Sequence, residues 1–236
     1  MSYDYSENIL VQESAGHLLE EELGWRVELA YNTEVLGETG TFGRKSYKEI
    51  LLVKYFRQAL LKLNQWLTPA LLEDAIKTFE SHMSSASLMQ INEEKYRCIR
   101  DGIPVKVKKP NGQIEEKKAI VIDFKNPDNN DYLAVKEMKI HGDIYRRRTD
   151  IVGFVNGIPL LFIELKKNSI DVQNAYTDNY TDYLDTIPHL FYYNAFLILS
   201  NGTEAKVGTL GSKYEFFHEW KRLSEQEEGN VALETM

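Results

Sequence analysis

The residues best suited to chemistry lie in the stretch 149–166, where two carboxylates and a lysine flank an apolar segment. Asp150 opens one expected strand, and Glu164 and Lys166 close the next. Because side chains two residues apart on a strand share a face, Glu164 and Lys166 are expected to point the same way. Paired carboxylates beside a lysine predict a site for a hard divalent cation, with Mg²⁺ the best match. Such an ion binds a phosphoryl oxygen and activates water, while the lysine stabilises negative charge.

The Glu-x-Lys spacing alone is not specific, because six other pairs in the chain share it. The strongest rival set is Asp123 with Glu137 and Lys139. Its carboxylates are 14 residues apart, as are those of Asp150 and Glu164. Glu164, however, follows six consecutive apolar residues, which is typical of a strand buried on both faces, where an unused charge is costly. Glu137 lies in an alternating segment typical of a half-exposed edge, so the Asp150 set is preferred.

The two carboxylates can share a cation only if the hairpin between them has an irregular register. A strict two-residue turn at Asn156 and Gly157 would pair Asp150 with Ile163 and direct it away from Glu164. We therefore expect a loop of odd length or a bulge, for example a type I turn with Gly157 in the left-handed region. A regular hairpin with the carboxylates on opposite faces would remove the metal site.

The elements that must position these residues follow an α/β pattern. Apolar residues at helical spacing predict a first helix over 13–23, with Ser14 as its cap, further helices within 47–95, and a helix over 174–184. Strands are predicted at 105–107, 119–124, 132–140, 151–155, 158–165 and 191–200. This order predicts an α/β fold, a mixed central sheet flanked by helices with an N-terminal helical segment.

Length and composition suit one folded unit. The 236 residues are 43% hydrophobic, which is enough to bury a core, and we predict a single domain over 1–236, with a helical part at about 47–95 and a β-rich core at about 103–222. The longest apolar run is far below the roughly 18 residues of a membrane span, so no membrane partner is expected. A single cysteine, Cys98, excludes an internal disulfide framework and fits a cytoplasmic setting. The net charge of −8 argues against coating nucleic acid through bulk charge.

Several segments match the pattern of a known family. The longest are NGQIEEKKAIVIDFKNPDNNDYLAVKEMKIHG, RRTDIVGFVNGIPLLFIELKKN and IPHLFYYNAFLILSNGTEAKVGTL, and FGRKSYKEILL, LNQWLTPALLEDAI and LGW add to them. They resemble the N-terminal nuclease region of the restriction (R) subunit of type I restriction-modification enzymes, a PD-(D/E)xK-type nuclease. The resemblance implies a restriction-endonuclease-like fold and Mg²⁺-dependent cleavage of double-stranded DNA. It also implies that the protein assembles with methyltransferase and specificity subunits. ATP-driven translocation is expected from motor domains that lie outside this sequence.

The resemblance also implies roles for individual residues. Asp150 and Glu164 become metal-binding carboxylates, the carbonyl of Leu165 a further ligand, and Lys166 the catalytic lysine. Thr149 stands where the family motif usually has proline, a position that shapes the backbone rather than the chemistry.

Five further residues are candidates near DNA or metal. The family often carries a glutamine four residues before a tyrosine; here Asn179 precedes Tyr183, and its amide offers the same donors and acceptor. Arg146 and Arg148 are candidates to contact phosphates, and a charged edge strand is the alternative. Glu13 is a candidate accessory carboxylate, with a solvated helix-start residue as the alternative.

Two other functions stay open at this stage. A non-catalytic docking module of the restriction complex would use the hairpin charges structurally and bind no divalent metal. A stand-alone DNA repair or junction nuclease would share the metal chemistry and be active as this chain alone.

Overall fold

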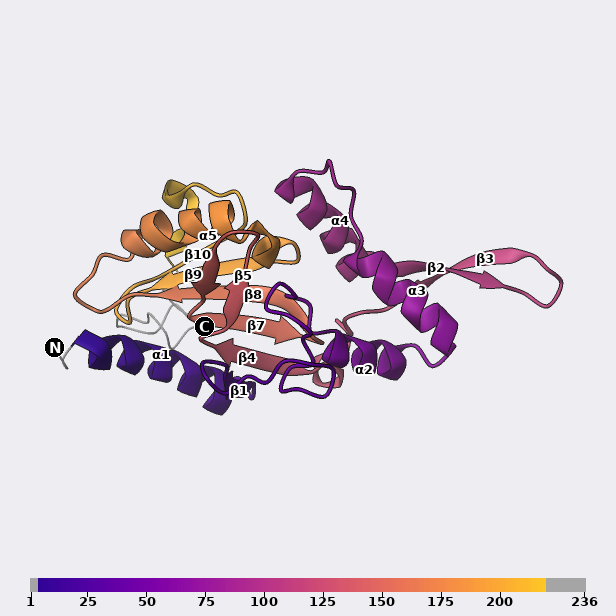
Figure 1. The fold of residues 1–236 in the computed structure, drawn as a ribbon, viewed down its shortest axis with the longest axis horizontal. Coiled ribbons are helices and arrows are strands. Elements are labelled where there is room, and N and C mark those ends of the chain that lie inside the picture. Colours follow the sequence, from indigo (N-terminus) through magenta and orange to yellow (C-terminus); the bar gives the residue numbers. More distant parts are fainter. Residues whose placement is uncertain (1–3, 220–236) are drawn as a thin grey trace.

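A seven-stranded mixed sheet forms the centre of the computed structural model, which describes residues 4–219 (Figure 1). The strand order is β1-β4-β7-β8-β9-β10-β11. β1 runs parallel to β4 and β8 parallel to β9, and the other neighbours are antiparallel. The strands are β1 (Arg26–Leu29), β4 (Tyr132–Lys136), β7 (Ile151–Val155), β8 (Ile158–Leu165), β9 (Phe196–Ser200), β10 (Ala205–Gly208) and β11 (His218–Glu219). The expected mixed central sheet is confirmed; the end of the predicted core, 220–222, lies outside the described residues.

Helices cover both faces of this sheet. On one face lies α1 (Asp4–Glu21), whose Ala15 and Leu19 pack against Ile151 of β7 and Ile163 of β8. On the other face lie a π-helical turn, η2 (Ala175–Tyr180), and α5 (Thr181–Thr186), with Tyr183 packed edge-on against Phe162 of β8. Alternation along β8 therefore sends Glu164, like Phe162, toward the α5 face.

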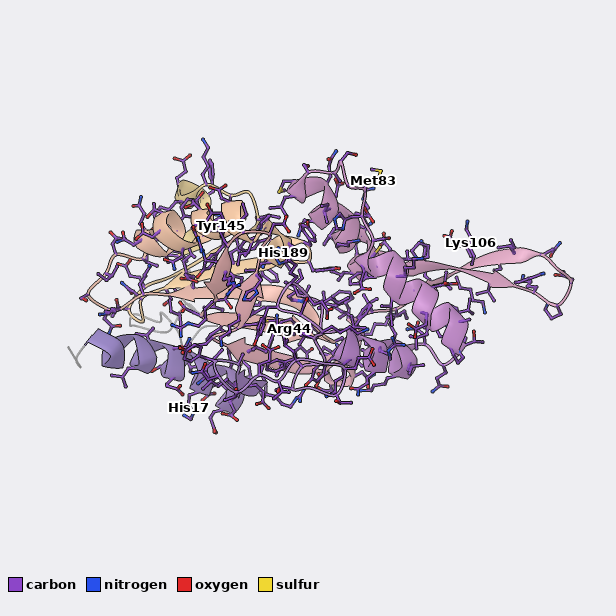
Figure 2. The ribbon with its side chains drawn as sticks, viewed as in Figure 1. His17, Arg44, Met83, Lys106, Tyr145 and His189 are labelled. Atoms are coloured by element: carbon purple, nitrogen blue, oxygen red, sulfur yellow. The ribbon has the colours of Figure 1, made fainter. Side chains whose placement is uncertain are left out.

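The remaining elements flank the sheet. Three amphipathic helices, α2 (Val53–Leu63), α3 (Pro69–Glu80) and α4 (Leu88–Asp101), fill the region where helices were expected. The hairpin β2 (Ile103–Lys108)–β3 (Ile114–Ala119) projects from them, with Lys106 on its exposed surface (Figures 1 and 2). A shorter hairpin, β5 (Lys139–His141)–β6 (Arg146–Arg148), connects β4 to β7. Within residues 4–219, no helix combines the length and apolar character needed to cross a membrane.

Some predicted boundaries are wrong, each for a local reason. Ser14 does not cap the first helix; it lies inside α1, where its hydroxyl donates to the carbonyl of Leu10 at 2.8 Å. The strand predicted at 119–124 lies instead at Ile114–Ala119, because the backbone amide of Ile120 donates to the side chain of Asn64 at 2.8 Å and leaves the hairpin.

Two predicted strands are also interrupted. The strand expected at 132–140 breaks into β4 and β5 because Glu137 adopts a positive φ of 54°. The strand expected at 191–200 begins only at Phe196, since a 3₁₀ turn, η3 (Pro188–Phe191), precedes it. The amides of Tyr192 and Asn194 close turns instead, donating to the carbonyls of His189 at 3.2 Å and Phe191 at 3.3 Å.

Candidate active site

A bulge in the β7–β8 hairpin brings the two carboxylates across from each other. The turn has two residues, Asn156 and Gly157, both at positive φ (53° and 79°), so the expectation of an odd-length turn is wrong. The expected bulge is confirmed: the register shifts between Gly153 and Phe154, which leaves Leu160 as an extra residue on β8. Beyond the bulge, Ile151 of β7 pairs with Ile163 of β8. One residue further from the turn, Asp150 therefore lies opposite Glu164.

Asp150, which is half-buried, and Glu164, which is buried, form a pair of acids. The backbone amide of Leu165 donates to Asp150 Oδ2 at 2.7 Å, so Leu165 lies beside Asp150. Glu164 is only 2% exposed, and its Oε2 has no hydrogen-bond partner among the described residues. Burial raises the pKa of Asp150 to about 6. Burial and the neighbouring Asp150 charge raise the pKa of Glu164 well above its usual range, partly opposed by Lys166 and Tyr183.

A cation fits this arrangement chemically. A carboxylate oxygen without a partner, buried beside a second acid, is costly unless a positive charge compensates it. Mg²⁺ is commonly bound by one or two carboxylates, with water and phosphate oxygens completing its shell. Asp150 and Glu164 would be the two acidic ligands; residues 4–219 contain no group of three or more histidine, cysteine, aspartate or glutamate side chains able to hold a metal.

Lys166 and two residues from the covering helix complete the cluster. Lys166 follows the last residue of β8, and its backbone amide donates to the carbonyl of Ser200 at 2.8 Å. Its ammonium donates to Oδ1 of Asn179, which lies in η2. Tyr183 follows four residues later in α5 and donates to the carbonyl of Arg148 at 3.1 Å. Burial and the nearby Glu164 charge raise the pKa of the Tyr183 hydroxyl.

The first helix contributes a residue that the sequence analysis missed. Gln12, which is 7% exposed, donates through Nε2 to the carbonyl of Asp150 at 3.2 Å. Its neighbour Glu13 instead forms an ion pair with Lys136 of β4, in which Glu13 Oε1 lies 2.7 Å from Lys136 Nζ. The structure therefore gives Glu13 a cationic partner and assigns the α1 contact with Asp150 to Gln12. No local pattern reveals this contact, because 138 residues separate its two ends.

The candidate arginines line the approach to Asp150 along β6. Arg148 pairs with Oε2 of Glu137 at 3.3 Å, and its guanidinium lies 4.5 Å from the ring centre of Tyr31. Arg146 is exposed and pairs across the β5–β6 hairpin with His141. Arg148 is thus near enough to Asp150 to lower the pKa of that acid, while its side chain stays partly exposed.

The rival acidic set does not assemble. Asp123 stabilises a loop: its Oδ2 accepts from the side chain of Asn129 at 2.8 Å, and its Oδ1 accepts from the amide of Asn126 at 3.0 Å. Glu137 is paired with Arg148, and Lys139 donates to Asn32 at 3.4 Å. The preference for the Asp150 set over this one agrees with the structure.

The structure thus places two acids and a lysine at the ends of neighbouring strands of a mixed sheet, in a chain of mixed α/β fold. A family model described as "Type I restriction enzyme R protein N terminus" matches residues 4–216. The chain therefore belongs to this family, and the resemblance seen in the sequence is confirmed.

Two curated relatives show the same relationship. The chain is 32% identical over 208 residues to the "Type I restriction enzyme HindI endonuclease subunit" of Haemophilus influenzae, covering 86% of this chain and 19% of the relative. It is 28% identical over 193 residues to the "Putative type I restriction enzyme MjaIXP endonuclease subunit" of Methanocaldococcus jannaschii, covering 80% and 18%. The chain thus spans about a fifth of the length of these relatives.

Proposed function

We propose that this chain is an endonuclease domain that hydrolyses phosphodiester bonds of double-stranded DNA with Mg²⁺. The observation that carries the proposal is the pair Asp150 and Glu164, which lie opposite each other on neighbouring strands, with a buried oxygen of Glu164 left without a partner among the described residues. Membership of the type I restriction family supports this reading, because its relatives are named as endonuclease subunits.

Each residue of the cluster has a distinct part in this proposal. Asp150 and Glu164 would hold the ion, with the carbonyl of Leu165 as a further ligand. Bound there, Mg²⁺ would supply a Lewis acid for a phosphoryl oxygen. Lys166 would position the attacking water or stabilise negative charge developing on the phosphate. Asn179 orients the ammonium of Lys166 through its Oδ1, and Tyr183 closes the side of the site.

DNA and protein partners follow from the same proposal. Arg146 and Arg148 would contact phosphates beside the scissile bond, which suits their place four and two residues before Asp150. Within a longer R subunit, motor domains would couple cleavage to ATP-driven translocation. Methyltransferase and specificity subunits would choose the DNA site, in a cytoplasmic setting.

A metal titration and a nicking assay test the proposal. We expect Mg²⁺ to raise the melting temperature of the chain, and a variant Asp150→Asn to lose that increase. Asp123→Asn, which alters the acid of the rival set, is the matched control and should keep it. In the full restriction complex, Asp150→Ala or Lys166→Ala should abolish cleavage while ATP hydrolysis persists.

Two results would contradict the proposal. Undiminished cleavage by Lys166→Ala complexes would remove the mechanism. A melting temperature that Mg²⁺ leaves unchanged, together with normal cleavage by Glu164→Gln complexes, would favour a docking module instead.

A further inference from the structure

One face of the β5–β6 hairpin is basic. Lys139 lies directly opposite Arg148, and His141 lies directly opposite Arg146. Residues paired across antiparallel strands share a face, and so do residues two apart on one strand. The three cations and the imidazole therefore lie together on the same side of this hairpin.

The other face of the hairpin anchors it to the core. Ile140 is fully buried there. Arg147 points toward α5, where its Nη2 donates to Oδ1 of Asp182 at 2.7 Å. The hydroxyl of Tyr183 donates to the backbone carbonyl of Arg148 at 3.1 Å. These contacts hold β6 in place, and the side chains of the basic face take no part in them.

Tyr31 brings two of the cations onto one aromatic ring. It follows β1, and the amide of the preceding Ala30 donates to the carbonyl of Lys136 in β4 at 2.8 Å. The centre of its ring is 4.5 Å from Cζ of Arg148 and 5.0 Å from Nζ of Lys139. Cations within about 6 Å of a ring centre are attracted to its face. The ring of Tyr31 therefore holds the two charges close together.

These two charges are only partly compensated. Like charges directly opposite each other on neighbouring strands are destabilising. Within residues 4–219, Glu137 is the one acid in ion-pair contact with the basic face, 3.3 Å from Arg148. Lys139 has an amide partner instead, Asn32. The side chain of Arg148 is 43% exposed, so an anion could reach it from solvent and reduce the repulsion.

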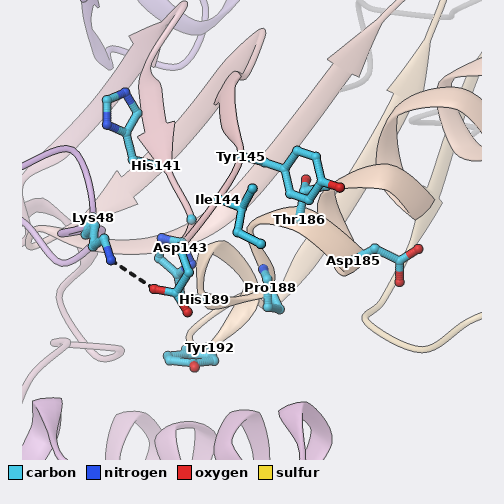
Figure 3. Close-up of a pocket in the computed structure, with 11 residues that line it drawn as sticks. Lys48, His141, Asp143, Ile144, Tyr145, Asp185, Thr186, Pro188, His189 and Tyr192 are labelled. Carbon is cyan, nitrogen blue, oxygen red and sulfur yellow. Dashed lines mark hydrogen bonds and ion pairs between the residues drawn. The ribbon is translucent and has the colours of Figure 1, made fainter.

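The excess of positive charge does not extend to the tip of the hairpin (Figure 3). There Lys48 pairs with Asp143 at 2.9 Å. Asp185 is a second acid in the lining of the cavity of about 450 Å³ beside them. The uncompensated cations lie instead toward the end of β6, where Arg148 is two residues from Asp150.

We propose that Lys139 and Arg148, held on the ring of Tyr31, bind a phosphate of the DNA strand beside Asp150. This role rests on the proposed nuclease function. Lysine and arginine contacts to phosphates fix the position of DNA without reading its sequence. Tyr31 is a positioning residue, because it contacts the two cations, and Glu137 competes with the phosphate for Arg148.

Binding of a short DNA duplex to the chain in a chelator, without divalent metal, tests this role. Fluorescence anisotropy from about 50 to 200 mM salt gives the dissociation constant and its salt dependence. We expect a dissociation constant of roughly 1–100 µM, the range of sequence-independent contacts. Lys139→Gln and Arg148→Gln should each weaken binding about threefold to tenfold, and each should reduce the logarithmic salt slope by about 0.9.

Substitutions that keep both cations test the other two residues. Glu137→Gln removes the competing carboxylate and should tighten binding about threefold. Tyr31→Leu should weaken binding about threefold, whereas Tyr31→Phe keeps the ring and should bind like the unaltered chain. In a chain that already carries Lys139→Gln and Arg148→Gln, Tyr31→Leu should have no further effect. A merely structural role for Tyr31 would not depend on these two cations.

Two matched controls make the same changes elsewhere. Nζ of Lys117 lies 5.3 Å from the ring centre of Trp66, in the projecting β2–β3 hairpin (Figure 1). Lys117→Gln therefore neutralises a lysine on an aromatic ring and should change the dissociation constant less than about twofold. Tyr96 lies on α4 with its ring centre 5.5 Å from Cζ of Arg100, and Tyr96→Leu should leave binding unchanged.

Equal losses in the Lys139→Gln and Lys117→Gln variants, an unchanged salt slope, or no binding of the duplex by the unaltered chain would overturn the proposal. Inorganic phosphate is a second source of the same chemistry. If it displaces the duplex more than chloride does at equal ionic strength, the site takes a free anion instead. Because neither metal nor cleavage enters this measurement, its failure leaves the proposed nuclease function standing. Loss of cleavage with duplex binding intact would remove only the nuclease function.

Discussion

The carboxylate of Glu164 lies in a buried position where the metal-free fold does little to stabilise its charge. Its side chain is almost fully buried, lies across from Asp150, and keeps one oxygen without a partner in the described chain. A structural role would be better served by an apolar or amide side chain of similar size. On the proposed function, a bound cation would compensate this buried charge.

Glu164→Gln should separate stability from function. The amide keeps the shape and removes the charge, so the free energy of unfolding of the metal-free protein should rise by about 1–3 kcal/mol. The increase in melting temperature caused by Mg²⁺ should disappear, because a ligand is lost. Denaturant and thermal unfolding with and without Mg²⁺ measure both effects. Glu116→Gln, on the exposed face of β3, is the control and should change neither; a destabilised Glu164→Gln protein would contradict the account.

The pH dependence of stability should reveal Asp150. Its pKa is about 6 in the fold, against 3.8 for an unperturbed group, so folding favours the protonated acid. This contribution is fully present below about pH 4 and is lost as the pH rises through 6, which should cost the metal-free protein about 2–3 kcal/mol. Chemical denaturation in a chelator from pH 4 to 7 measures the loss. Asp150→Asn should flatten this part of the curve, and an unchanged slope would refute the assignment.

Asn179 is expected to act by positioning Lys166. Asn179→Ala frees the ammonium and should lower the cleavage rate of the full complex roughly 10–100-fold, with little change in DNA binding. Asn179→Gln retains an amide and should recover part of that rate. Single-turnover cleavage and DNA-binding assays distinguish the two effects. Equal losses in both variants would mean that Asn179 only supports packing.

At the scale of elements, the β7–β8 hairpin shows what the sequence could predict. Counting residues from Asn156 and Gly157 shows that a regular register would separate the acids, so either an odd-length loop or a bulge is required. Its position at Leu160 was not predictable, because an extra residue anywhere between the turn and Glu164 satisfies the same count. Periodicity thus predicts that both strands exist and that their register must shift by one residue. Side-chain packing decides at which residue the bulge lies.

Contacts between distant segments were beyond sequence reasoning. The spacing of Asn179 and Tyr183 was visible in the sequence, but the hydrogen bond from Lys166 depends on how η2 packs over β8. Gln12 could not be predicted from the sequence, because its contact with Asp150 joins residues that are 138 positions apart. Glu137 broke a predicted strand through a positive φ that no residue preference indicated.

Replacing Asn156 in the β7–β8 turn should lower the free energy of unfolding. Its amide donates to the carbonyl of Val121 and to Asn130 Oδ1, both at 2.8 Å, and its Oδ1 accepts from the amide of Asp131 at 2.8 Å. Asn156→Ala removes these bonds at a positive φ and should cost about 2–4 kcal/mol of unfolding free energy. Asn111→Ala, in the exposed β2–β3 turn, should cost no more than about 0.5 kcal/mol. Equal effects in denaturant titrations would contradict this view of the turn.

The whole molecule places α1 on one face of a mixed sheet and η2 with α5 on the other (Figure 1). The acids lie on the α5 face, where β7 begins and β8 ends. On the proposed function, DNA would approach the acids past β6, the strand that carries Arg146 and Arg148.

The central claim is that Asp150 and Glu164 hold one divalent cation between them. Crystals of the chain soaked in Mn²⁺, an anomalous scatterer that substitutes for Mg²⁺, test it directly. The account predicts an anomalous peak within about 2.0–2.6 Å of an oxygen of each carboxylate. Mn²⁺ bound elsewhere with no peak at these two side chains, or the same peak retained in Asp150→Ala crystals, would contradict it.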